Sequence, residues 1–118
     1  MLVPELKSLT SPDLKRDELP KDPGCCCVLV EVEISPKGID GGDIFSFVVA
    51  TPNMLDVTDR WQWGRGYLIL GTFSWGLVER AVQSLLSHAS GESWKELTDK
   101  LSKELNWEFE NFGSENKV

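Results

Sequence analysis

The sequence has one histidine and only three cysteines, and this scarcity limits the chemistry that it can support. A catalytic Ser-His or Cys-His pair would depend on His88, which falls in the last turn of an expected helix, where the helix dipole favours a cation. We therefore expect a structural or solvent-facing histidine. Cys25, Cys26 and Cys27 are adjacent, so they close no loop by disulfide formation and lack the spacing of zinc ligands. An extended strand would turn Cys26 inward and its two neighbours outward.

Other motifs of enzymes and membrane proteins are also missing. The sequence has no glycine-rich phosphate loop, no nucleophile elbow and no apolar run near the roughly 20 residues that span a bilayer. Its first residues include prolines and acids too early for the apolar region of a signal peptide. We therefore expect a cytoplasmic protein with no catalytic residue, no cofactor and no metal.

Basic residues are few, since 12 lysines and arginines stand against 19 acids, which gives a formal net charge of −7. The acids are concentrated between residues 25 and 59, where six acids accompany a single lysine. Such a charge opposes binding to nucleic acid and to anionic membranes, and it favours a basic partner. We expect a protein partner, with no nucleic acid and no membrane bound.

The length of 118 residues fits one domain with a single core. Residues 1–24 hold four of the six prolines, so we predict an extended arm that packs on an α+β domain formed by residues 25–118. Within that domain, residues 26–35 and 43–51 alternate in polarity and predict two strands joined by a short loop. The apolar run 67–73 predicts a third strand.

Helix signals are concentrated in the second half of the sequence. Ser74 precedes apolar residues that recur every three or four positions, and Ser93 with Glu96 forms a capping box before a second such stripe. A brief helical turn is expected after Thr51, and residues 106–112 alternate as a last strand. The predicted fold is α+β, an antiparallel sheet of about four strands with two helices packed on one face, in the order β-β-β-α-α-β.

Paired glutamates mark two of the expected strands. Glu31 and Glu33, like Glu108 and Glu110, are two residues apart, so each pair lies on one face of its strand. In the last strand, Trp107 would occupy the opposite, inward face. Acid–base catalysis by such a pair requires a burying pocket, which nothing in the sequence supplies. Ordinary solvated charge and a partner-contact surface remain the two open interpretations.

The polar stretch 56–66 is expected to be a loop, and it carries two tryptophans, Trp61 and Trp63, between Arg60 and Arg65. Aromatic and arginine residues are enriched at interface hot spots. Tryptophan is also usually buried to a large extent. The two tryptophans therefore either contact a partner or fold back on the protein.

Several stretches resemble, in order, the successive motifs of the bacterial immunity protein 8 family: FSFVVATPNML, GRGYLIL, GESWKEL and WEFENF. The similarity runs from about residue 5 to residue 112, with Asn111 at a position where the family often has an acid. The resemblance implies a small antitoxin that binds and blocks a polymorphic or contact-dependent toxin. It implies no catalytic residue.

Charge and resemblance together predict a surface that meets a cognate toxin domain, and a nuclease with a basic cleft is a fitting target. The alternative is an adaptor that homodimerises through a sheet edge, so we expect a monomer or a weak dimer; a carboxylate-pair enzyme is a remote third. The candidate partner-binding residues are Glu31, Glu33, Asp40, Asp43, Glu108, Glu110, Trp61 and Trp63.

Overall fold

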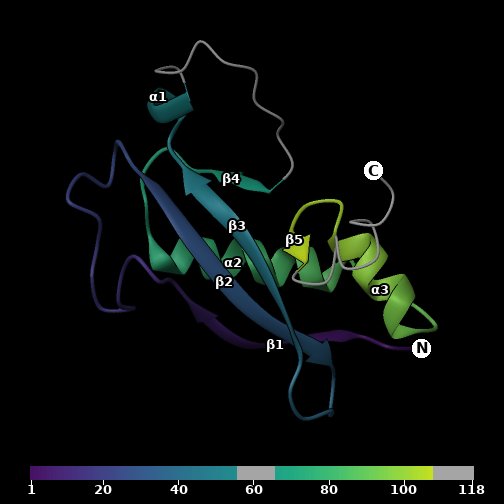
Figure 1. Ribbon diagram of the computed structural model, residues 1–118. Coiled ribbons are helices and arrows are strands. Elements are labelled where there is room, and N and C mark those ends of the chain that lie inside the picture. The colour runs from purple at the N-terminus through teal and green to yellow at the C-terminus, as the bar shows by residue number, and fades with distance from the viewer. Residues whose placement is uncertain (56–65, 108–118) are drawn as a thin grey trace, which may run out of the picture.

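The computed structural model describes residues 1–55 and 66–107, and in these ranges it has a mixed α+β architecture. A five-stranded sheet lies in front of α2 in the view of Figure 1, with α3 at one end. The elements in chain order are β1 (Pro4–Thr10), β2 (Cys27–Pro36), β3 (Asp43–Ala50), α1 (Pro52–Leu55), β4 (Tyr67–Ile69), α2 (Trp75–Ser87), α3 (Trp94–Leu101) and β5 (Asn106–Trp107).

The sheet is largely antiparallel, with one parallel pair. Its order is β1-β2-β3-β4, and β5 also pairs with β3. The predicted hairpin of β2 and β3 is confirmed, with Cys27 opposite Ala50 and Ile34 opposite Asp43. β4 runs parallel to the second half of β3, and β5 runs antiparallel to its first half. The edge of β3 that faces away from β2 is therefore shared by two short strands.

The sequence analysis did not predict β1, which lies inside the segment expected to be an extended arm. The reason is a register shift between Leu6 and Ser8. It places Leu6 opposite Ile34 and Leu9 opposite Val32, so two leucines three residues apart lie on the same face. This bulge breaks the period of two by which a strand is recognised in sequence. Pro4 is tolerated because it is the first residue of an edge strand.

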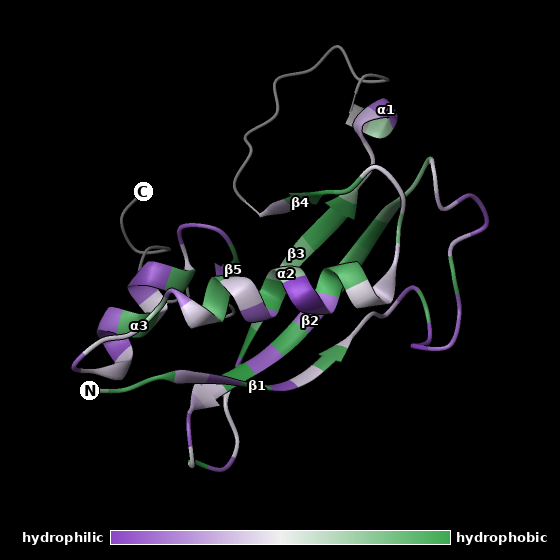
Figure 2. Cartoon of the chain, turned by 180° about the vertical axis from the view of Figure 1, so that it is seen from behind, coloured by the Kyte–Doolittle hydropathy of each residue, from purple (hydrophilic) through white to green (hydrophobic). Residues whose placement is uncertain are grey.

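The core lies between the sheet and the helices. Figure 2 shows α2 lying across the largely hydrophobic β2 and β3. Val78 and Val82 of α2 and Leu97 of α3 are buried against these strands, each contributing about 2 kcal/mol relative to an exposed side chain. The strand residues that form the core are Val28, Val30, Val32, Ile34, Phe45, Phe47 and Val49. The inward orientation predicted for Cys26 is also confirmed, with Cys25 and Cys27 exposed.

The predicted helix starts are confirmed by their capping hydrogen bonds. The Ser74 side chain accepts from the Leu77 N–H, and the Ser93 side chain accepts from the Glu96 N–H at 3.2 Å. His88 is exposed at the C-cap of α2, where its Nδ1 lies 2.8 Å from the Ser84 carbonyl oxygen. Within the described ranges, every helix is too short or too polar to cross a bilayer.

Candidate partner-binding surface

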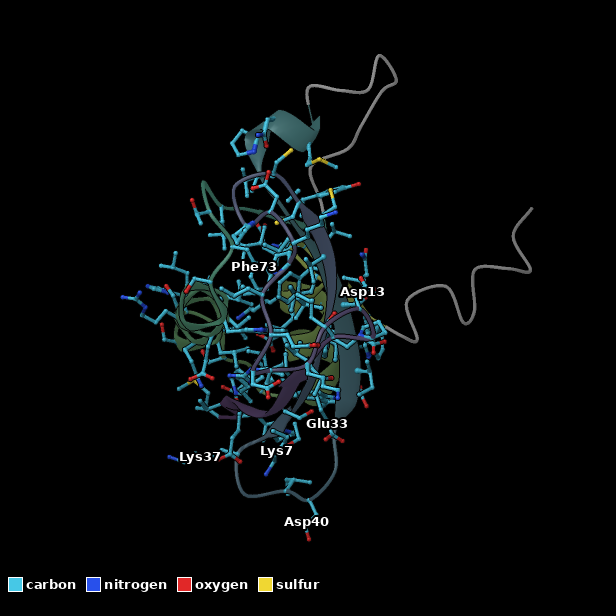
Figure 3. The ribbon with its side chains drawn as sticks, turned by 90° about the vertical axis from the view of Figure 1, so that its left-hand side faces the viewer. Lys7, Asp13, Glu33, Lys37, Asp40 and Phe73 are labelled. Atoms are coloured by element: carbon cyan, nitrogen blue, oxygen red, sulfur yellow. The ribbon has the colours of Figure 1, made fainter. Side chains whose placement is uncertain are left out.

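The two faces of the sheet differ in what covers them. α2 and α3 pack on the core side through Val78, Val82 and Leu97. Figure 3 shows α2 end-on at one side of the sheet, with Asp13 and Glu33 at the other side. We call the side away from α2 the outer face; no helix of the described ranges covers it.

Glu31 and Glu33 lie on this outer face, because the alternate residues of β2 are buried on the core side. Both glutamates are half-buried. Glu31 lies between Thr10 of β1 and Ser46 of β3, and Ser8 is the β1 neighbour of Glu33. The pair thus stands about 7 Å apart on a polar surface that faces away from the helices, as the alternation predicts.

A third carboxylate of this region belongs to Asp13, which the sequence analysis did not single out. Its Oδ2 accepts a hydrogen bond from the Leu29 N–H at 3.1 Å, beyond the point where β1 stops pairing with β2 at Thr10. Asp13 therefore occupies the edge of β2 next to the glutamates. No sequence pattern links Asp13 to residue 29, so only the fold could reveal the contact.

Asp43 belongs to the core side of the sheet. It lies opposite Ile34, a buried core residue, at the start of β3. Its Oδ2 accepts from the indole N–H of Trp94 at 2.8 Å and from that of Trp107 at 3.0 Å. The expected grouping of Asp43 with the glutamates of β2 is therefore wrong: the period of two puts Asp43 on the other face, where it joins α3 and β5 to the sheet. Contact of Asp43 with a partner stays a prediction.

The remaining candidate residues are dispersed or lie outside the described ranges. Asp40 is exposed in the loop between β2 and β3, at the lower tip of the molecule in Figure 3. Trp107 packs inward as expected, stacked on Phe45 with 6.4 Å between ring centroids. Four candidates, Trp61, Trp63, Glu108 and Glu110, lie outside the described residues, and their roles stay predictions.

The outer face also has an apolar part, which the sequence analysis missed. Leu29 of β2 is 36% exposed and lies opposite Val48 of β3. Ile69 of β4 is 45% exposed and lies opposite Ala50, which in turn lies opposite Cys27. The signal was hidden because the pairing of β4 with β3, which brings Ile69 onto the same face as Leu29, leaves no local pattern in the sequence.

The family model of immunity protein 8 matches residues 4–112. The chain belongs to the immunity protein 8 family. The match begins at the first residue of β1, so the strand inside the proline-rich segment is part of the family region. No curated protein and no solved structure gives a significant match.

In this immunity protein 8 chain, the outer strand β1 has features that oppose pairing with another strand. The bulge at Lys7 interrupts its hydrogen-bonding pattern, and a lysine on an edge strand disfavours edge-to-edge association. The Lys7 ammonium lies 2.8 Å from the Glu5 carboxylate, and this hydrogen bond and charge lower the pKa of Glu5. The Lys7 charge thus offsets that of the ionised Glu5, whereas no ion pair among the described residues offsets the charges of Glu31, Glu33 and Asp13.

On the core side, this family member has a cavity of about 300 Å³ next to β4. Its walls are mostly apolar, and the one carboxylate among the lining residues is Glu104. The described lining holds no histidine or cysteine. In the described ranges, no cluster of three histidine, cysteine or acidic side chains has metal-binding geometry.

Proposed function

We propose that this chain is the immunity protein of a toxin–immunity pair, which binds the cognate toxin domain in the bacterial cytoplasm and blocks it without covalent chemistry. Membership of the immunity protein 8 family, over residues 4–112, is the observation that carries the proposal. The toxin belongs to the polymorphic or contact-dependent class, and the immunity protein protects the producing cell and its siblings.

Electrostatic complementarity supports this mechanism. The chain carries a net charge of −7, and two half-buried glutamates, Glu31 and Glu33, face outward from the sheet. A toxin that attacks nucleic acid needs a basic cleft for phosphates, and an acidic protein surface fits such a cleft. Attraction between the two also speeds their encounter, so the toxin is captured before damage accumulates.

The acidic and aromatic candidates are proposed as the contact residues. Glu31 and Glu33 have the strongest structural support, because they lie two residues apart on the outer face, which no helix of the described ranges covers. Asp40 extends the negative charge into the adjacent loop. The full set proposed for toxin contact is Glu31, Glu33, Asp40, Asp43, Glu108, Glu110, Trp61 and Trp63.

The test is protection of cells. The gene immediately upstream of this one is expected to encode a toxin with a small, basic C-terminal domain, and that domain is expressed from an inducible promoter. Co-expression of this chain should restore growth, and Glu31→Lys/Glu33→Lys should weaken protection. A charge reversal outside the outer face, Glu92→Lys before α3, should protect as well as wild type. Failure of the wild-type chain to protect would remove the proposal.

The alternative, an adaptor that homodimerises through a sheet edge, has less support. The Leu29 N–H at the exposed part of the β2 edge is already bound by Asp13, and β1 carries the bulge at Lys7. Both features disfavour addition of a further strand. Light scattering of the chain alone should give the mass of a monomer, whereas a stable dimer would favour the adaptor.

A further inference from the structure

The outer face has two adjoining halves of opposite character. The acidic half consists of Glu31 and Glu33, where β1 flanks β2, and of Asp13, which binds the Leu29 N–H just beyond the end of β1. The apolar half consists of Cys27, Leu29, Val48 and Ile69, and it continues across β2, β3 and β4. Leu29 is two residues from Glu31 in the same strand, so the halves meet within about 7 Å.

The apolar half brings exposed side chains of two strands onto one face of the sheet. Leu29 and Ile69 are 36% and 45% exposed, and the half-buried Val48 lies in the strand between them, whereas its neighbour Ala50 is fully buried. Single exposed apolar side chains are normal on soluble proteins, but contiguous apolar surface bordered by charge marks an interaction site. Apolar centres with polar rims are also the usual anatomy of protein interfaces.

We propose that the apolar half is the anchor of the toxin contact, and that the toxin docks there with an apolar centre flanked on one side by lysines or arginines. The inference rests on the proposed function for the identity of the partner. Its own content is the location and chemistry of the contact: apolar side chains bind over Leu29 and Ile69, and cations bind over Glu31 and Glu33.

Charge argues for a basic partner in preference to a second copy of this chain. Two copies would each bring a net charge of −7 and an identical acidic half to the contact, and like charges at an interface oppose association. A cationic partner meets the acidic half without this penalty. Because charge flanks the apolar half on the β1 side, the partner can dock in one orientation only.

The two halves should act on different rate constants. Charges at the border of an interface mainly accelerate encounter, whereas desolvated apolar contacts in its centre mainly slow dissociation. Loss of Leu29 and Ile69 should therefore raise koff, with little change in kon. Loss of charge at Glu31 and Glu33 should lower kon and weaken its dependence on salt.

Binding kinetics of the full-length chain test this division. The probe is the upstream-encoded toxin C-terminal domain, made catalytically inactive and immobilised. The double variant Leu29→Ser/Ile69→Ser should raise koff about tenfold, since truncation of central contacts is costly. Glu31→Gln/Glu33→Gln should lower kon about fivefold at low salt, with a smaller loss at high salt.

Matched controls are available on the opposite side of the molecule. Leu77 of α2 has an exposed fraction of 39%, similar to the 36% of Leu29. Leu77→Ser should leave both rate constants unchanged. Glu92, exposed before α3, provides the same control for charge as Glu92→Gln. Urea unfolding of each variant shows that the fold is retained, so that a change in koff reports the contact itself.

Cys27 supplies a second, independent readout, because it is an exposed thiol within the apolar half. In a Cys25→Ser background, bound toxin should slow alkylation of Cys27 at least about tenfold, as expected for a thiol covered by an interface. Alkylation at the same rate in free and bound protein would overturn the inference.

The outcomes separate the inference from the function on which it rests. Wild-type protein that binds toxin, with Leu29→Ser/Ile69→Ser binding equally well, overturns the inference and leaves the proposed function standing. Wild-type protein that neither binds nor protects overturns both. If the chain forms a dimer without toxin, and Leu29→Ser/Ile69→Ser dissociates that dimer, the face binds a second copy. If Cys27 is alkylated faster in full-length Phe109→Ser/Phe112→Ser, the face binds the chain's own C-terminal segment. Either result overturns the inference.

Discussion

Trp94 and Trp107 donate their indole N–H groups to the same oxygen, Oδ2 of Asp43, at 2.8 and 3.0 Å. Trp94 begins α3 and Trp107 ends β5, so one carboxylate of β3 joins two elements from the other end of the chain. Trp107 also stacks on Phe45. The position at which the chain continues past β5 is therefore set by contacts on the core side of the sheet.

Removal of this shared acceptor should destabilise the fold. Asp43→Ala leaves two half-buried indole donors without their partner, and we expect a loss of about 2 kcal/mol in the free energy of unfolding. Asp43→Asn keeps one oxygen acceptor and should lose about half as much. Urea unfolding followed by tryptophan fluorescence measures both. The control is Asp40→Ala in the exposed loop, and equal stabilities for Asp40→Ala and Asp43→Ala would contradict the shared-acceptor role.

Gly66 should be intolerant of a side chain for two separable reasons. Its φ of +84° is a left-handed conformation, and a Cβ there would lie 2.7 Å from the Asn106 side-chain nitrogen. Gly38 has the same φ with open space around it, so Gly38→Ala reports the cost of conformation alone, about 1 kcal/mol. Gly66→Ala should cost about 2 to 3 kcal/mol, with the excess due to contact.

Asn106→Ala should recover that excess in the Gly66→Ala background, because it removes the side chain that the new methyl group meets. Thermal or urea unfolding of the double-mutant cycle measures the coupling between the two positions. If Gly66→Ala and Gly38→Ala lose the same stability, close packing of Gly66 against Asn106 plays no part.

Arg16 should hold the segment between β1 and β2 on α2. Its guanidinium carbon lies 5.0 Å from the centre of the Trp75 ring, and its Nη1 donates to the Leu9 carbonyl oxygen at 3.1 Å. The ion pair with Glu79 is half exposed on both sides and contributes little. Arg16→Ala should therefore lose about 1 kcal/mol, chiefly through the ring and carbonyl contacts.

The same variant should expose the segment to proteolysis, because local opening becomes more frequent when its contacts are weakened. Cleavage by a lysine-specific protease after Lys21 should accelerate about fivefold in Arg16→Ala. Glu79→Gln, which removes only the surface ion pair, serves as the control and should be cut at the wild-type rate. Equal rates for all three proteins would show that Arg16 does not restrain the segment.

Elements with local signals could be predicted from sequence, and those without them could not. The caps Ser74 and Ser93 and the alternation of β2 depend on near neighbours in the chain, and the structure agrees with each prediction. β1 was missed because its bulge hides the alternation. The parallel pairing of β4 was missed because short strands contain no information about their neighbours.

The candidate surface followed the same rule. The outward orientation of Glu31 and Glu33 is a local property of β2, and it was predictable. Asp43 was assigned to the wrong face because the acids were grouped by charge alone. It is two residues from the buried Phe45 in β3, so the two side chains lie on the same face of the strand. The apolar half was not predicted, since Leu29 and Ile69 come to lie on one face, on either side of β3, only when the sheet forms.

Cys26 should make stability depend on pH at the alkaline end. Burial, followed by the neighbouring Cys27 and Asp22, raises the pKa of the Cys26 thiol above its ordinary value. The native state therefore retains this proton at a pH where the unfolded chain has lost it. The stabilisation is fully present below the ordinary thiol pKa of about 8.5 and is lost as pH rises through the higher folded value.

A Cys25→Ser/Cys27→Ser variant leaves Cys26 as the single thiol and makes the effect measurable. The rate of its alkylation, plotted against pH, should have a higher midpoint in the native protein than in urea, because only the thiolate reacts. The midpoint reports the pKa of the thiol, whereas the absolute rate does not, because burial also slows access of the reagent to Cys26 at every pH. In parallel, replacing this buried thiol by Cys26→Ala should flatten the decline of unfolding free energy as the pH rises above the ordinary thiol pKa of about 8.5. Identical midpoints in the native and unfolded protein would show that burial in the core leaves the thiol unperturbed.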